Sequence, residues 1–367
     1  MTLLPGAPAA VAAWGLPTAH RLPDRPLADH DFDELLTRCT QQRILGLLGA
    51  ATEAGDLPVT PAQRERLDTH WQDWLGHAVR AERAALTVSA TLAEAGIRSR
   101  VLKGLALAHT AYPDPSMRVF GDVDLLVPHD RLHAGATLLV AELDGQRAEP
   151  EVRPGFDDRF AREAMVRTLG VEVDLHRTLV NGAYGVRLPL PTLFDDGRVV
   201  TVGGGTFTVL ATVPRLLHAA YQSTLADSPP RLVALRDLVQ ILTREGPDPR
   251  DVVATAHAWR GRAPLAAAVR LAWRTLRLTT RPPLVEWAEE HHAPLADRAL
   301  LAAARGGARG YTAGLTTLLA LPGTRDRIDY ARAVLTPSAE YRDARGFGRW
   351  ALVGAGTRRL RSATRAR

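Results

Sequence analysis

The sequence predicts an α+β fold in which a small mixed sheet lies between two helical regions. Apolar residues recur at helical spacing over residues 29–95, short β-branched and apolar segments separated by turns fill residues 97–211, and the helical period returns from Thr212 onward. Because helices and strands are grouped along the chain instead of alternating, the pattern favours an α+β arrangement over repeated βαβ units.

These changes predict four regions: an N-terminal helical region at 1–95, a sheet-bearing catalytic core at 96–211, a C-terminal helical domain at 212–340 and a basic tail at 341–367. The formal net charge is +6, but the tail alone holds eight arginines against Asp343, a local +7 that leaves the preceding residues at about −1. Such a tail is typical of a solvated chain end. The basic balance therefore gives no support for nucleic acid as the substrate, and a nucleic-acid partner is not expected.

The helical regions have recognisable ends. In the first region, apolar positions three and four apart run to Gly55, and a second helical run starts at Pro61 and stops at Gly96. After Thr212, further helices are predicted over residues 214–226, 230–246, 251–261 and 264–276.

The central region predicts the strands. Residues 97–104 are β-like, 105–112 are helical, 113–121 form a loop rich in turn residues, and 122–127 form a strand followed by a helix after Pro128. Two more strands are expected at 164–169 and 171–179, divided near Gly170, and a hairpin is expected over 198–211, where three glycines permit the turn.

Two acidic residues in the predicted strand 122–127 carry the first chemical signal. Asp122 and Asp124 are two residues apart, so both carboxylates project from one face. Two like charges held this close resist ionising together unless a cation neutralises them. Hard oxygen ligands without a nearby thiolate favour Mg²⁺ or Mn²⁺ over Zn²⁺. The pair therefore predicts a divalent-cation site.

The same pair has a second interpretation, a solvent-facing strand edge. Val123, Leu125 and Val127 give the strand a buried face, however, and carboxylates on a core strand are costly without a partner. Asp174, in the predicted strand 171–179, supplies a third carboxylate if the two strands are adjacent. Glu172 shares the face of Asp174 and takes this role if the register differs.

Lys103 is the single lysine among 46 cationic residues, the rest being arginines. If arginine has replaced lysine nearly everywhere, the remaining lysine is a candidate for a position where arginine fails; the alternative is chance. Lys103 lies next to Gly104 between a predicted strand and a helix, and a compact ammonium fits against phosphate oxygens where a planar guanidinium is too wide. Arg118, four residues before Asp122, is a second candidate phosphate ligand.

A set of residues along the chain forms one larger pattern: Lys103, Gly104, Tyr112, Arg118, Asp122, Asp124, Asp174 and His176, with His218, Arg236 and Asp237 in the helical flanks. With this pattern the chain resembles the polymerase-beta-type nucleotidyltransferase superfamily, and specifically its "uncharacterised nucleotidyltransferase" family. The resemblance covers roughly residues 30–245 and includes helical flanks. It departs from the wider superfamily in one respect, since Lys-Gly replaces Gly-Ser and lies farther from the acidic pair.

The resemblance implies that Asp122 and Asp124 bridge two magnesium or manganese ions and that Asp174 completes one metal site and helps to deprotonate the acceptor. It implies an NTP, such as ATP, as co-substrate, with Lys103, Gly104 and Arg118 at the nucleotide. For His176 three roles stay open: orienting the carboxylate of Asp174, contacting substrate, or a buried histidine satisfied by the backbone.

The predicted function is transfer of a nucleoside monophosphate from an NTP to a hydroxyl or phosphate of a small molecule, sugar or peptide, with release of pyrophosphate. One alternative is a sugar-nucleotide-dependent glycosyltransferase, which also uses Asp-x-Asp, although the helical residues 29–95 occupy the place of its nucleotide-binding half. Another is a noncatalytic nucleotide-binding or protein-interaction module, against which the three acids count.

The expected compartment is the cytoplasm. Cys39 is the only cysteine, which predicts a reducing environment, and no Cys/His spacing indicates a zinc site. The N-terminal apolar stretch lacks a cationic start and contains three prolines, so it is not expected to be a signal peptide. With no apolar run of about eighteen residues, no membrane span is predicted either.

Overall fold

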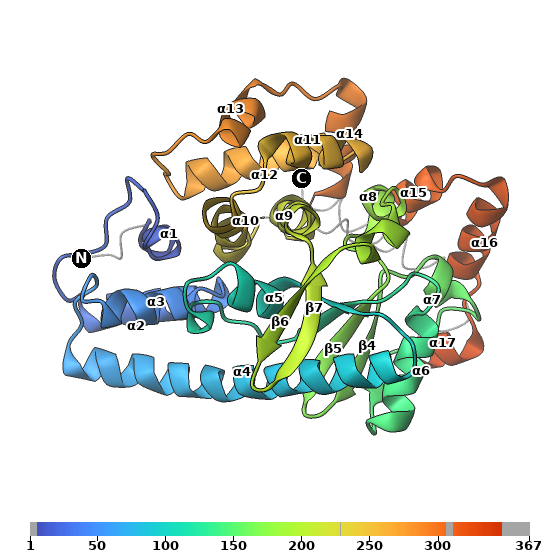
Figure 1. Cartoon of the computed structure of the whole chain (residues 1–367), viewed down its shortest axis with the longest axis horizontal. Coiled ribbons are helices and arrows are strands. Elements are labelled where there is room, and N and C mark those ends of the chain that lie inside the picture. The colour runs from blue at the N-terminus through green and yellow to red at the C-terminus, as the bar shows by residue number, and fades with distance from the viewer. Residues whose placement is uncertain (1–5, 228, 306–310, 347–367) are drawn as a thin grey trace, which may run out of the picture.

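The computed structural model describes residues 6–227, 229–305 and 311–346 and shows a mixed sheet covered by helices (Figure 1). The predicted α+β fold, with its sheet between N-terminal and C-terminal helical regions, is confirmed. In the ranges just given, none of the helices combines the length and apolar character that crossing a bilayer requires. Most of the predicted basic tail, residues 347–367, lies outside the described residues.

One sheet runs through the described chain in the order β3-β4-β5-β2-β1-β7-β6. Neighbours β2 and β5 are parallel, as are β1 and β7, and the other neighbouring pairs are antiparallel. This pairing places the two strands predicted to carry acids side by side. The strands are β1 (Arg100–Val101), β2 (Val123–Leu126), β3 (Gln146–Arg147), β4 (Glu163–Thr168), β5 (Val171–His176), β6 (Gly197–Val202) and β7 (Gly205–Leu210).

Two tight turns close hairpins in this sheet. Gly203 and Gly204 join β6 to β7 with φ of 55° and 83°, and Leu169 and Gly170 join β4 to β5 with φ of 54° and 74°. Two consecutive residues with positive φ match the right-handed twist of the flanking strands, which is why glycine is favoured there. The predicted glycine-rich hairpin and the break near Gly170 are both confirmed.

The N-terminal helices begin and end close to their sequence signals. Thr60 accepts a hydrogen bond from the Gln63 backbone while the Gln63 side chain accepts one from the Thr60 backbone, a capping box ahead of Pro61. Gly96, with φ of 71°, follows the end of that helix. The helices are α1 (Ala7–Ala13), α2 (Asp29–Gln41), α3 (Leu45–Glu53) and α4 (Pro61–Glu94).

Short helices connect the strands, and a longer series follows them. The connecting helices are α5 (Lys103–Thr110), η1 (Pro115–Met117), α6 (Leu132–Glu142), α7 (Phe156–Arg159), α8 (Gly182–Val186) and η2 (Leu190–Phe194). The C-terminal series is α9 (Thr212–Tyr221), η3 (Gln222–Ala226), α10 (Leu232–Glu245), α11 (Pro249–Ala258), α12 (Arg262–Thr275), α13 (Pro283–Glu290), α14 (Leu295–Ala304), α15 (Tyr311–Ala320), α16 (Thr324–Leu335) and α17 (Ala339–Ala344).

Two clusters of buried apolar residues hold these elements together. One cluster joins α1, α2 and α3 to α9, α10 and α12, so helices from the two ends of the sequence share a core. The other joins the sheet to α6 and to the second half of α4, which runs along the sheet in Figure 1. The predicted boundary near residue 95 therefore falls between a helix and the sheet against which that helix packs.

Candidate active site

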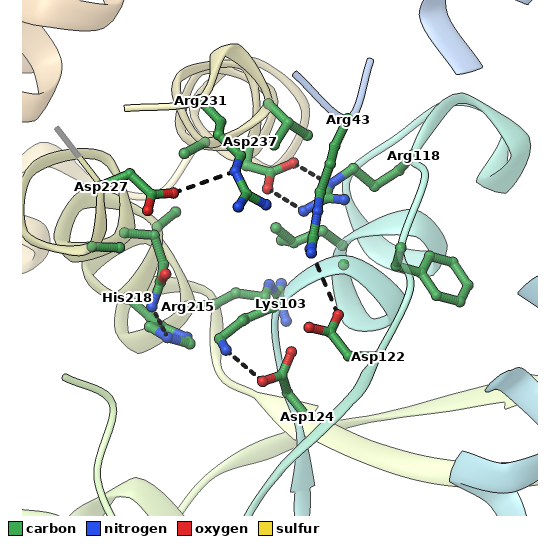
Figure 2. Close-up of a pocket in the computed structure, with 18 residues that line it drawn as sticks. Arg43, Lys103, Arg118, Asp122, Asp124, Arg215, His218, Asp227, Arg231 and Asp237 are labelled. Carbon is green, nitrogen blue, oxygen red and sulfur yellow. Dashed lines mark hydrogen bonds and ion pairs between the residues drawn. The ribbon is translucent and has the colours of Figure 1, made fainter. Parts of the chain in front are cut away.

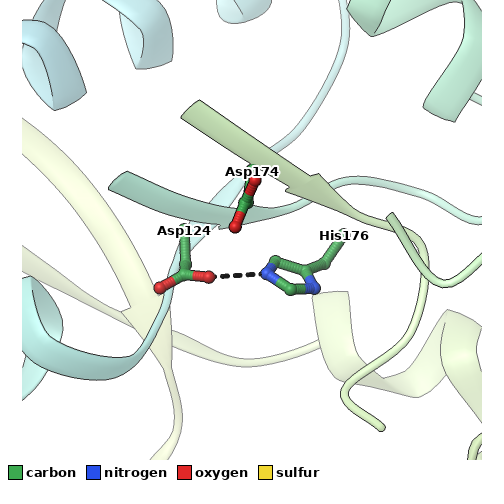
Figure 3. Close-up of side chains that lie close together, drawn as sticks. All are labelled: Asp124, Asp174 and His176. Atoms are coloured by element: carbon green, nitrogen blue, oxygen red, sulfur yellow. Dashed lines mark hydrogen bonds and ion pairs between the residues drawn. The ribbon is translucent and has the colours of Figure 1, made fainter. Parts of the chain in front are cut away.

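Asp124 and Asp174 lie side by side where β2 and β5 run parallel. The register pairs Asp124 with Asp174, two residues before the pair formed by Leu126 and His176. Ligand atoms of Asp124, Asp174 and His176 all lie within 4.8 Å of one another (Figure 3). The adjacency that the third carboxylate requires is therefore present in the sheet.

Asp124 is buried, with 2% of its side chain exposed, and two groups meet its Oδ1 atom. The Lys103 ammonium donates to Oδ1, and His176 Nε2 lies 2.7 Å from the same atom. Burial alone would raise the pKa of Asp124, but the Lys103 charge and the His176 hydrogen bond hold that pKa well below its ordinary value. Asp124 is thus an ionised carboxylate inside the protein, held by a cation.

His176 acts on Asp124 and not on its strand neighbour Asp174. An ionised carboxylate only accepts, so Nε2 must carry the proton that the two residues share. Nδ1 faces Glu163, whose Oε2 is 3.2 Å away. Burial and the nearby Lys103 charge lower the pKa of His176, against the opposing effect of the two carboxylates. Of the predicted alternatives, the geometry matches an orienting histidine, although the carboxylate it orients is Asp124.

Asp174 has an unsatisfied oxygen. Its Oδ1 atom is buried and has no hydrogen-bond partner among the described residues. The pKa of Asp174 is raised to about 7, first by burial and then by the negative charges of Glu163 and Asp124. A buried carboxylate oxygen that repels its neighbours suits a cation ligand. The alternative, Glu172, is exposed and pairs with Arg167 at 3.0 Å.

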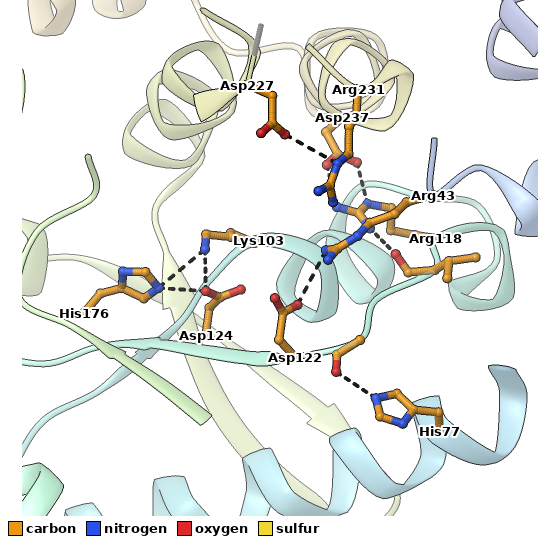
Figure 4. Close-up of polar contacts among 12 residues, drawn as sticks. Arg43, His77, Lys103, Arg118, Asp122, Asp124, His176, Asp227, Arg231 and Asp237 are labelled. Atoms are coloured by element: carbon orange, nitrogen blue, oxygen red, sulfur yellow. Dashed lines mark hydrogen bonds and ion pairs between the residues drawn. The ribbon is translucent and has the colours of Figure 1, made fainter. Parts of the chain in front are cut away.

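Asp122 immediately precedes β2, and a residue from the N-terminal helices reaches it. Arg43, between α2 and α3, places Nη1 3.7 Å from Asp122 Oδ1. His77 on α4 donates from Nε2 to the Gly121 carbonyl at 2.7 Å, which fixes the backbone just before Asp122. Figure 4 shows Asp122 and Asp124 directed to the same side of the strand, toward Arg43 and Lys103.

Lys103 is the first residue of α5 and has φ of 48°, in the left-handed region. A non-glycine residue there costs about 1 to 2 kcal/mol. The next residue has no room for a side chain, because a Cβ on Gly104 would lie 2.5 Å from Phe120 Cβ and 3.2 Å from Arg118 Nη1. The Lys-Gly pair therefore combines a strained backbone that presents an ammonium with a close approach that only glycine permits.

Arg118, Tyr112 and Asp237 form one buried cluster. Arg118 donates from Nε and Nη2 to the two Asp237 oxygens at 2.7 and 2.8 Å, and the Tyr112 hydroxyl donates to Asp237 at 2.8 Å. This cluster ties the loop before β2 to α10. Since Asp237 already holds the guanidinium, phosphate binding by Arg118 stays a prediction.

The two remaining flank residues lie apart from each other. Arg236 donates to the carbonyls of Ala12 and Trp14, which anchors α1 on α10. His218 lines the cavity described next and contacts Gln222 at 3.1 Å. Burial, followed by the Lys103 charge, lowers the pKa of His218 to about 3.

The acids face a cavity with two lobes. The Asp237 lobe, about 100 Å³, is lined by Arg118, His218 and Asp237 (Figure 2). The Asp174 lobe, about 420 Å³, is lined by Arg162, Asp174, Asn181 and Tyr221, and its volume is in the range of small-ligand pockets. The side chains that line both lobes include Arg43, Lys103, Asp122 and Arg231.

Sequence reasoning missed Arg43, Arg162 and Arg231. Arg231 pairs with Asp227 at 3.4 Å with 42% of its side chain exposed, and Arg43 is 38% exposed, so both have freedom to meet a ligand. Each is one of 45 arginines, and no local pattern marks it. Only the fold brings these cations to the acids.

One of three comparisons with known proteins, a family sequence model, agrees with the motif. Residues 28–277 match the sequence model of a family described as "Uncharacterised nucleotidyltransferase". Among solved structures, an antigenic nucleotidyltransferase-like protein from Paracoccidioides brasiliensis is 15% identical, with a TM-score of 0.31 over 56% of this chain and 96% of that one. A TM-score of this size does not establish a common fold. No curated protein shows a significant match to this sequence.

Proposed function

Since this chain belongs to the uncharacterised nucleotidyltransferase family, we propose that it transfers a nucleoside monophosphate from an NTP to a hydroxyl or phosphate of a small molecule, sugar or peptide. The observation that carries the proposal is the pairing of Asp124 with Asp174 on parallel strands, beside a cavity lined by Lys103 and several arginines. Family membership favours this reaction over a sugar-nucleotide glycosyltransferase.

The residues present fit divalent cations. Asp174 offers a buried, unpartnered oxygen, Asp124 is beside it, and Asp122 faces the same cavity. Oxygen ligands of this kind suit Mg²⁺ or Mn²⁺. We assign Asp122, Asp124 and Asp174 as the ligands, for two ions. Bound there, the cations would stabilise the negative charge that develops on the transferred phosphoryl group.

The chain's own residues supply the other parts of the reaction. Lys103, with Arg43 and Arg231, binds the triphosphate, and Asp174 accepts the proton of the acceptor. The acceptor oxygen then bonds to the α-phosphorus while the bond from that phosphorus to the bridging oxygen breaks, and pyrophosphate leaves. His176 keeps Asp124 oriented through its 2.7 Å contact.

Labelled nucleotides test the proposal. The protein is incubated with each of the four α-³²P-labelled NTPs, Mg²⁺ and pools of polyols, sugar phosphates and hydroxyl-bearing peptides, while label transfer and pyrophosphate release are followed. Magnesium-dependent NTP binding is measured in parallel because it needs no acceptor. We expect the wild type to bind and transfer, and Asp122→Ala and Asp124→Ala to lose both. A wild type without magnesium-dependent binding or turnover, or alanine variants that match it, would contradict the assignment.

A further inference from the structure

We propose that Lys103 couples nucleotide binding to cation binding by exchanging one partner, Asp124, for another, the phosphates of the nucleotide. This inference rests on the proposed function and adds an order of events to it. As long as the ammonium holds Asp124, it opposes a divalent cation at that carboxylate. When phosphates draw the ammonium away, Asp124 becomes available.

The first argument is that Lys103 already neutralises the carboxylate that a cation needs. Its ammonium and His176 Nε2 converge on the same oxygen of Asp124, and the two nitrogens are 3.4 Å apart. Only 2% of the Asp124 side chain is exposed, so water screens little of the charge there. An ammonium and a divalent cation sharing this buried carboxylate would repel each other strongly. Binding of the cation therefore requires Lys103 to move or to find a second negative partner.

The second argument is that the chain strains its backbone to present this group. Lys103 has φ of 48° at the first residue of α5, a conformation that glycine adopts more cheaply. Strained backbone of this kind collects at sites where function requires it. A point charge on a flexible stem can change partners, whereas a guanidinium with five fixed donors is harder to place against one carboxylate oxygen. Both features match a lysine in a chain whose other 45 cations are arginines.

The third argument is that the Lys103 ammonium faces a cavity in which it can find a different partner. Its side chain is 23% exposed, more than that of Asp124, and it lines both lobes of the cavity together with Arg43 and Arg231. Phosphate oxygens bound by the two arginines would lie in the same cavity that the ammonium faces. In this inference, rotation about the bonds of the lysine stem changes its partner from a carboxylate to a phosphate.

Thermodynamic linkage makes the consequence measurable. If phosphates release Asp124 from Lys103, they strengthen cation binding, and the cation must strengthen phosphate binding by the same factor. Lys103 thus prevents tight cation binding before the nucleotide arrives. Removing the ammonium should strengthen the binding of the cation alone and abolish most of the coupling.

The experiment measures Mn²⁺ binding by electron paramagnetic resonance, with and without inorganic tripolyphosphate as a base-independent probe. Complex formation between Mn²⁺ and tripolyphosphate in buffer is measured in parallel and subtracted. The variants are Lys103→Met and Lys103→Gln, two uncharged side chains of similar length, so a fold defect in one still leaves the other. Arg231→Met is the matched control, since it removes a cation from the same cavity without touching Asp124.

In both Lys103 variants we expect Mn²⁺ alone to bind about tenfold more tightly than in the wild type, and the coupling with tripolyphosphate to fall from about tenfold to about one. Arg231→Met should weaken tripolyphosphate binding and leave the affinity for Mn²⁺ alone unchanged. Folded Lys103 variants whose affinity for Mn²⁺ alone is equal to or lower than the wild type's would overturn the inference. A wild type that binds no NTP would instead contradict the proposed function, and the Mn²⁺ comparison still decides the role of Lys103.

Discussion

Two groups of carboxylates and histidine in the described chain meet the same distance criterion for a metal site, but they differ in the partners of their acids and in the surroundings that they face. Asp124, Asp174 and His176 form the first, which we call the sheet cluster, and His133, Glu151 and Asp157 form the second, the edge cluster. The comparison shows that short distances between ligand atoms do not by themselves distinguish a metal site from a structural cluster.

The acids of the edge cluster already have partners within the described chain. Arg147 pairs with Asp157, the Asp157 backbone donates to Glu151 at 2.8 Å, and His133 is half exposed, with Nδ1 3.6 Å from Glu151. The sheet cluster keeps an unpartnered buried oxygen on Asp174 and opens onto a cavity lined by cations. The same distance limit is therefore met by a structural ion pair in the edge cluster and by a candidate active site in the sheet cluster.

The largest effect expected is on the third carboxylate of the sheet cluster. Asp174→Asn keeps the shape but removes the charge and the proton acceptor, so nucleotidyl transfer should fall about a thousandfold or more. Glu172→Gln, on the same face of β5 but paired with exposed Arg167, is the control and should keep transfer within about twofold of wild type. Steady-state rates of pyrophosphate release measure both. The reverse order of effects would make Glu172 the third carboxylate.

The next effect concerns the cations beside each cluster. Arg43→Met and Arg231→Met should each raise the KM for the NTP about tenfold, because each removes one charge-assisted contact with phosphate. Arg147→Met, beside the edge cluster, should leave KM unchanged. Initial rates over a range of NTP concentrations separate KM from kcat. Equal KM values in all three variants would show that the cavity arginines do not bind the nucleotide.

Breaking the edge cluster should affect stability instead of activity. Asp157→Asn weakens the ion pair with Arg147, whose side chain is 19% exposed, and should lower the free energy of unfolding by about 1 to 3 kcal/mol. Transfer by the folded variant should stay within about twofold of wild type. Urea titration and rate measurements on one preparation report both quantities. A large loss of transfer with unchanged stability would give the edge cluster a catalytic role.

The smallest effect is on the pH dependence of stability. With a pKa of about 3 in the folded protein, below the ordinary value of about 6.5, buried His218 binds a proton more readily after unfolding. The contribution of neutral His218 to the free energy of unfolding is fully present above about pH 7. About 1 kcal/mol of that contribution is lost as the pH falls from 7 to 5.5. His218→Gln should remove that loss from urea titrations at the two pH values. The control His133→Gln, at the edge cluster, should retain it.

Local patterns predicted the parts of the site that local residues form. β-Branched and apolar segments identified the strands of Asp124 and Asp174, and a run of three glycines identified a hairpin. Contacts between residues far apart in the sequence could not be predicted from any local pattern. Arg43 reaches Asp122 from a turn between N-terminal helices, and Asp237 holds Arg118 from 119 residues away. His176 contacts Asp124 on the neighbouring strand, whereas its spacing along its own strand had predicted a contact with Asp174.

Cation binding by matched variants tests the central claim most directly. Mn²⁺ affinity is measured in the presence of NTP for the wild type, Asp174→Asn and Asp157→Asn, each confirmed as folded. The account predicts that Asp157→Asn binds Mn²⁺ as the wild type does and that Asp174→Asn binds it at least about tenfold more weakly. Unchanged affinity in Asp174→Asn, together with a loss in Asp157→Asn, would contradict it and place the metal at the edge cluster.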